Sequence, residues 1–257
     1  MARVHIWWLF LLVGFVSACQ KELQSGTATQ DGSFKLNIRF DPVVDGRPLL
    51  FNSTNTNFFG EPYTVKTFKF YISQIDLVST DGSLFKADRS NYYLINEADS
   101  GSATISLNPA ARTYSQLAFV IGVDSAKNVS GAQTGALDPA NGMFWTWNSG
   151  YIMAKLEGSS PLSTAPDNRI EYHIGGFKEP YKVLRRVVLP LPLTGAAFLS
   201  GSVNTMVVTA NVNAWFHDPH ELRIAKTPVW MTPGDTSVKI AENYARMFTV
   251  THITRNQ

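Results

Sequence analysis

The histidines are the side chains of this 257-residue chain that are best suited to hold a transition metal. Four of them follow the apolar N-terminal segment: His173, His217, His220 and His252. Imidazole binds copper and zinc, and a β scaffold can bring rings from distant strands to one site. The spacing His217-x-x-His220 is that of a ligand pair, but the Asp-Pro between the two predicts a helix start. The two rings then need not converge, so this pair is the weaker one and a structural or solvent-facing role is favoured.

His173 and His252 each occur in a strand-like segment, where alternation decides what the ring faces. His173 falls on the same strand face as Glu171, whose carboxylate could orient the ring. That face could equally be the solvated side of a sheet. His252 falls on the face of Phe248 and Val250, and the alternative to a ligand there is a hydrogen-bonded core histidine. The residues alone favour a structural role for both.

A second candidate region is the segment 122–151, which is dense in glycine, Asx residues and other turn formers. This composition predicts a long ordered loop on a β scaffold, the usual place for a binding site. The segment carries Trp145 and Trp147, whose alternation would place both indoles on one face of an extended strand. They could form a stacking surface for a carbohydrate or a peptide, or else pack in the core.

The same segment supplies four side-chain oxygens close together in the sequence, on Asp124, Asn128, Asp138 and Asn141. Oxygen donors of this kind hold Ca²⁺. Such residues more often cap their own turns. Calcium is therefore a less favoured ion for this chain than copper.

The chain lacks the short motifs of common enzymes: a Gly-x-Ser-x-Gly elbow, a phosphate loop, a dinucleotide fingerprint and a His-Glu-x-x-His zinc motif. Its net charge is +2, without a cluster of Lys and Arg, which argues against a nucleic-acid partner. A non-enzymatic binding protein is therefore the simplest prediction.

The N-terminus predicts a lipoprotein. Residues 1–18 resemble a signal peptide that ends in Val-Ser-Ala directly before Cys19. The apolar run is too short for a spanning helix, which needs about twenty residues. Cys19 is the only cysteine, so lipidation and a membrane anchor are its expected use.

Residues 19–32 predict a flexible tether. We expect an outer-membrane lipoprotein of a bacterial cell envelope, and the Gln-Lys-Glu after the cysteine resembles an export signal to the cell surface.

Period-2 alternation of apolar and polar residues dominates residues 33–257. Strands are predicted at residues 34–40, 68–77, 92–96, 103–107, 116–123, 152–157, 169–174, 182–189 and 204–215, with a bulge at residues 73–74. A helix is predicted over residues 235–247, and a second one after Asp218. The predicted fold is all-β: a single antiparallel β-sandwich with a long functional loop and one or two short helices.

Several motifs carry a family resemblance. They are Gly-Val-Asp-Ser-Ala at residues 122–126, Gly-Met-Phe-Trp-Thr-Trp-Asn-Ser-Gly-Tyr at 142–151, Tyr-His-Ile-Gly-Gly at 172–176 and Ile-Ala-Glu-Asn-Tyr-Ala-Arg-Met-Phe at 240–248. Together they resemble the MbnP-like family of periplasmic or surface proteins, from about residue 34 to the C-terminus.

The resemblance implies a copper-binding protein whose site would use His173 and His252. It also implies that Trp145 or Trp147 is oxidised to kynurenine by a partner di-haem cytochrome c peroxidase. The family pattern places a further histidine shortly after the first strand, where this chain has Pro42. Proline cannot ligate a metal, so the resemblance implies a weaker or altered copper site. A surface module that recognises a glycan, a peptide or a partner lipoprotein through the 122–151 loop is the alternative.

Overall fold

The computed structural model describes residues 32–147, 150–192 and 196–256. The predicted signal peptide, most of the tether and Cys19 lie outside the described residues.

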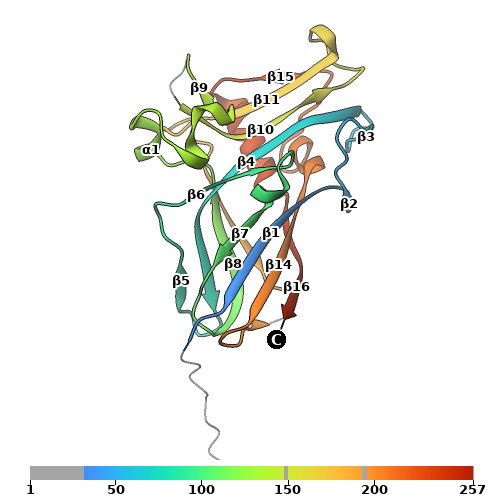
Figure 1. Cartoon of the computed structure of the whole chain (residues 1–257). Coiled ribbons are helices and arrows are strands. Elements are labelled where there is room, and N and C mark those ends of the chain that lie inside the picture. The colour runs from blue at the N-terminus through green and yellow to red at the C-terminus, as the bar shows by residue number, and fades with distance from the viewer. Residues whose placement is uncertain (1–31, 148–149, 193–195, 257) are drawn as a thin grey trace, which may run out of the picture.

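Two β-sheets pack against each other, with short helices and loops gathered at one end (Figure 1). The all-β sandwich is thus confirmed. Within the described part of the chain, none of the helices combines the length and the apolar character that crossing a membrane requires.

The smaller sheet has the strand order β16-β14-β1-β2, and β7 pairs with β1 as well. Its strands are β1 (Lys35–Val44), β2 (Arg47–Pro48), β7 (Thr104–Leu107), β14 (Val203–Asn211) and β16 (Phe248–Asn256). β1 runs parallel to β14, whereas the other pairs of this sheet are antiparallel. The sheet is therefore mixed, not wholly antiparallel as predicted. The long chain between β1 and β14 leaves their direction free, because only a short hairpin enforces antiparallel pairing.

The larger sheet has the order β12-β8-β4-β10-β11-β15, and short strands pair along β4, β8 and β10. Its strands are β3 (Asn55–Thr56), β4 (Pro62–Ser79), β5 (Leu84–Lys86), β6 (Tyr92–Asn96), β8 (Thr113–Ile121), β9 (Phe144–Trp145), β10 (Gly150–Ser159), β11 (Arg169–Gly175), β12 (Arg185–Pro190), β13 (Ala196–Ala197) and β15 (Val229–Trp230). The predicted bulge in β4 is confirmed: the register with β8 shifts between Ser73 and Asp76, and Gln74 has φ +51°.

The core lies between the sheets and is built largely from aromatic side chains. Phe40 of the smaller sheet contacts Phe70 and Phe119 of the larger one edge-on, with ring centroids 5.9 and 5.8 Å apart. Phe248 of β16 completes the group, with its centroid 6.0 Å from that of Phe40. Edge-to-face pairs of this kind add about 0.5–1.5 kcal/mol each beyond the burial of their area. Apolar and polar residues alternate along these strands as predicted, and this alternation places the rings on the inner faces of the two sheets.

Two α-helices are present in the described residues: α1 (Ser125–Val129) and α2 (Asp235–Tyr244). The helix predicted over residues 235–247 is present, but it ends at Tyr244. The helix predicted after Asp218 is wrong, because Asp218 has φ +62° and its carboxylate accepts hydrogen bonds from Arg246 instead of capping a turn. The strand predicted to reach residue 215 ends at Asn211, and the 3₁₀ turn η5 (Val212–Phe216) follows. Further 3₁₀ turns are η1 (Ser100–Ala103), η2 (Gly135–Leu137), η3 (Pro139–Asn141) and η4 (Pro166–Asn168).

Candidate functional site

His173 lies on the outer face of the larger sheet, since its neighbours Tyr172 and Ile174 are buried in the core. Its Nε2 atom is 2.6 Å from Oε1 of Glu157 on the adjacent strand β10. Glu171 lies directly across from Glu157 in the β10–β11 pair. The carboxylate that orients the imidazole is therefore Glu157, and not Glu171 as the sequence predicted.

Cationic side chains border this cluster. The Lys155 ammonium lies 3.5 Å from Oε1 of Glu157, and Nε of Arg169 lies 3.0 Å from Oε2 of Glu171. The hydrogen bond from His173 is the main reason that the pKa of Glu157 is lowered to about 2, against the opposing effect of burial. Glu157 is thus held as a carboxylate at any pH near neutral.

The donor atoms of Glu157, Glu171 and His173 all lie within 4.8 Å of one another. Around one ion, such atoms would each lie about 2.0–2.2 Å from the metal. The cluster can therefore close on an ion with small side-chain movements, and the metal would replace the proton that His173 and Glu157 share. One imidazole nitrogen with two carboxylates fits a divalent ion such as Cu²⁺ or Zn²⁺ better than Cu⁺, which prefers softer ligands.

Glu157 was not singled out from the sequence. It alternates with Lys155 in the predicted strand 152–157, and Glu171 alternates with His173 in the strand 169–174. The two polar faces meet only because Lys155 pairs with His173 and Glu157 with Glu171. That register is set by the connection between the strands, which the sequence pattern does not define.

His252 lies in the other sheet, on β16, and the ligand group around His173 does not include it. The register of β16 with β14 shifts between Val250 and His252, so Thr251 is an extra residue in the strand. This bulge turns the imidazole away from the face of Val250, and His252 is exposed. The predicted core environment for His252 is therefore wrong, and the structure does not bring His173 and His252 together.

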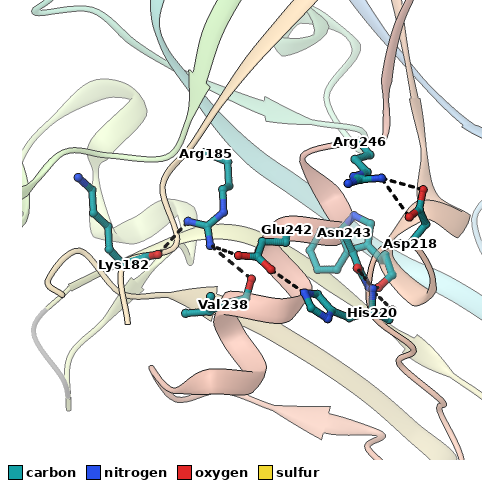
Figure 2. A network of polar contacts seen from close by, with 9 residues as sticks. Lys182, Arg185, Asp218, His220, Val238, Glu242, Asn243 and Arg246 are labelled. Atoms are coloured by element: carbon teal, nitrogen blue, oxygen red, sulfur yellow. Dashed lines mark hydrogen bonds and ion pairs between the residues drawn. The ribbon is translucent and has the colours of Figure 1, made fainter. Parts of the chain in front are cut away.

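His217 and His220 have separate surroundings. The ring of His217 stacks on Phe58, with centroids 3.9 Å apart. His220 Nε2 lies 2.5 Å from Oε2 of Glu242 on α2, and Arg185 lies 3.5 Å from the other carboxylate oxygen (Figure 2). The two rings do not converge, as the sequence indicated.

Asn128 is buried and ties the 122–151 loop to the sheet. Its side-chain amide donates to the carbonyls of Val123 and Asp124 at 2.7 and 2.8 Å. Its Oδ1 accepts the backbone N–H of Tyr151 at 2.8 Å. All three bonds join backbone segments of the loop and of β10, so Asn128 is a structural residue of the loop.

The other three oxygen donors also serve the loop itself. Asp124 accepts the Lys127 N–H at 3.1 Å and caps α1, and Asp138 accepts the Ala140 N–H at 2.8 Å and caps η3. Asn141 donates to two backbone carbonyls of the same loop. The prediction that such residues cap their own turns is confirmed for Asp124 and Asp138, whereas Asn128 and Asn141 bridge backbone segments instead.

The two tryptophans have different environments although they touch. Trp145 is 5% exposed and packs its ring against the backbone of Gly175, whereas Trp147 is 63% exposed. Their ring centroids lie 5.4 Å apart at an interplanar angle of 40°. β9 ends at Trp145 and a turn follows, so the strand alternation that would have given both indoles one environment does not extend to Trp147.

Comparison with known proteins gives one family. A family model described as MbnP matches residues 33–233. Among solved structures, MbnP from Methylosinus trichosporium is similar over 88% of this chain and 99% of that chain, with a TM-score of 0.52 and 14% identity. No curated protein matches the chain. At this identity the structural likeness establishes the fold, and the family model extends over most of the described sandwich.

Proposed function

Because the chain belongs to the MbnP family, we propose that it is a lipid-anchored protein of the bacterial cell envelope that binds one divalent metal ion without catalysing a reaction. Copper in its divalent form is the proposed ion. His173, Glu157 and Glu171 are the proposed ligands. The observation that carries the proposal is the approach of these three donor groups to within 4.8 Å on adjacent strands.

The proposed donor set replaces the two-histidine site that the family resemblance implied. His252 belongs to the other sheet, whereas Glu157 and Glu171 are paired beside His173. For a given set of nitrogen and oxygen ligands, divalent copper binds more tightly than zinc. The neighbouring Lys155 and Arg169 compete with the ion for the carboxylates, so we expect moderate affinity.

The predicted peroxidase partner belongs to this proposal as well. Trp147 is 63% exposed and Trp145 is 5% exposed. An external oxidant reaches an exposed indole more readily than a buried one. If a di-haem peroxidase modifies this chain, Trp147 is therefore the proposed target.

Isothermal titration calorimetry of the full chain in detergent, with copper(II) and then with zinc, tests the metal site. We expect one ion per chain, and a loss of about tenfold or more in affinity for His173→Ala and for Glu157→Gln. His252→Ala is the matched control and should bind as the wild type does. Absence of uptake, or an unchanged affinity of His173→Ala, would overturn the proposal. An equal loss in His252→Ala would instead support the two-histidine site.

The second candidate is the surface binding module predicted for the 122–151 loop. The specific observation that favours it is the exposed indole of Trp147 beside an aromatic cavity bordered by Trp145. Exposed aromatic side chains that gather at a hollow are typical of recognition surfaces.

A further inference from the structure

A cavity of about 260 Å³ opens where β10 begins and β11 ends. Its aromatic lining comes from Trp145, Tyr151, Phe177 and Tyr181, and the lining also includes two charged residues, Lys178 and Glu179. The volume lies just below the range of about 300–1,000 Å³ for pockets that hold drug-sized ligands. A single ring fits such a cavity better than an extended molecule does.

Close packing fixes the walls of the cavity. A Cβ at Gly176 would lie 2.2 Å from the carbonyl oxygen of Tyr181, so only glycine lets these two backbone segments approach. The hydroxyl of Tyr151 donates to the carbonyl of Leu137 at 2.8 Å, which holds that ring in place. A cavity with fixed walls needs little ordering when it binds a ligand, and this favours affinity.

Two aromatic side chains near the cavity are exposed to solvent. Trp147 is 63% exposed and stands against Trp145, while Tyr181 is 40% exposed and belongs to the lining. Flat aromatic faces that remain in water offer apolar area to a ligand at a low cost in side-chain entropy.

The charges around the cavity select against an ionic ligand. Lys178 and Glu179 are adjacent and of opposite sign, so they add no net charge. The Lys178 ammonium lies 5.3 Å from the centroid of the Phe177 ring, so this ring already has a cation beside it. An anionic ligand would meet the carboxylate of Glu179 as well as the ammonium of Lys178, so the pair gives it no net attraction. Lys178 offers hydrogen-bond donors and Glu179 offers acceptors, a combination that suits hydroxyl groups.

We propose that this cavity binds one neutral sugar ring of a glycan. The apolar C–H face of the sugar stacks on the aromatic lining, and its hydroxyls hydrogen-bond to Lys178 and Glu179. This inference develops the second candidate function and identifies its ligand class. It is independent of the metal site, because none of the three metal ligands lines the cavity.

Saturation-transfer NMR of the full chain, in a sugar-free ether detergent and with a chelator present, tests the inference. The probes are the methyl glycosides of glucose, mannose and N-acetylglucosamine. We expect at least one to bind with a dissociation constant on the order of 1 mM, as suits a single ring. Trp147→Ala and Tyr181→Ala should each weaken binding about tenfold or more. Phe58→Ala is the matched control, since Phe58 is 68% exposed and does not line the cavity.

The binding results distinguish a sugar from other classes of ligand and from the absence of a binding site. Lys178→Ala changes an exposed side chain, so its expected loss of binding keeps the test valid if an aromatic variant fails to fold. Binding of tetramethylammonium or of a proline-rich hexapeptide in place of the glycosides would overturn the sugar assignment and keep the binding module. If none of these probes binds, or if Phe58→Ala weakens binding as much as Trp147→Ala, the cavity is not a recognition site. The chelator makes all these results independent of the metal proposal.

Discussion

His173 and Glu157 form a hydrogen bond across the β10–β11 pair, with Nε2 of the imidazole 2.6 Å from Oε1 of the carboxylate. The bond has two consequences for the outer face of the larger sheet. It stabilises the charged form of Glu157, and it holds the imidazole beside a second carboxylate, that of Glu171. The same contact therefore contributes to stability without a metal, and it holds together two of the three side chains that we propose as metal ligands.

Acid should weaken the fold through Glu157. Its pKa is lowered from 4.5 to about 2, so the carboxylate stabilises the folded state fully above about pH 4.5, and this contribution is lost as the pH falls towards 2. Because solvent screens this partly exposed carboxylate, the contribution is about 2 kcal/mol at most, less than the full pKa shift would correspond to. We expect the difference in unfolding free energy between the wild type and Glu157→Gln to shrink over this range in urea titrations. A constant difference from pH 6 to pH 2 would contradict the assignment.

The strands with one buried face were predictable, because burial of a single face imposes alternation on the sequence. Leu36, Ile38 and Phe40 are buried while the residues between them are not, and β1 contains residues 35–40 of the predicted segment, although it continues to Val44. Even the bulge of β4 was visible, since the apolar positions change phase next to Gln74. Alternation thus reports burial directly.

The candidate site was less predictable because it depends on strand register and on a bulge, and the alternation of apolar and polar residues specifies neither. Glu157 reaches His173 through the register of two strands, and His252 leaves the core because of a bulge after Val250. Apolar residues do not mark that bulge, since Thr251 and His252 are both polar. Trp147 is exposed because the strand of Trp145 ends there.

Removing the Asn128 side chain should destabilise the loop that carries the tryptophans. Asn128→Ala leaves two carbonyls and the Tyr151 N–H without their partner, at a cost of about 2 kcal/mol in the free energy of unfolding. Asp138→Ala, which removes only the cap of a 3₁₀ turn, should cost about 0.5–1 kcal/mol. Thermal unfolding monitored by circular dichroism measures both.

Calcium provides a further comparison for the same loop. Oxygens of Asp124, Asn128 and Asp138 already accept hydrogen bonds from backbone N–H groups or from the Tyr92 hydroxyl, so we expect calcium to leave the unfolding temperature of the wild type unchanged. A clear rise with calcium, absent in Asp124→Ala and Asp138→Ala, would show instead that these carboxylates hold the ion.

The proposed lipidation of Cys19 gives a prediction about localisation. Because Val-Ser-Ala precedes the only cysteine, we expect the chain to incorporate labelled palmitate and to partition with the membrane fraction. Cys19→Ser removes the acylated thiol and should abolish the label. Equal labelling of both forms would contradict lipidation at this residue, and protease treatment of intact cells then reports which face carries the domain.

The approach of Gly175 to Trp145 gives the last prediction. A Cβ at position 175 would lie 2.5 and 2.7 Å from two carbons of the Trp145 ring, closer than any real contact. Gly175→Ala should therefore push the indole out of its place and cost about 1–3 kcal/mol in the free energy of unfolding. Because Trp145 borders the aromatic cavity, the same change should weaken binding of a methyl glycoside.

Tryptophan fluorescence and urea unfolding measure this effect. We expect Gly175→Ala to shift the emission to longer wavelength, and the shift to disappear when Trp145→Phe is added. Gly234→Ala is the matched control, because a Cβ there would lie 3.5 Å from the nearest atom of Trp230, an ordinary contact distance. If Gly175→Ala is as stable as Gly234→Ala and keeps the wild-type emission, then the added Cβ is accommodated without displacing the indole, which would contradict the close packing of Gly175 against Trp145.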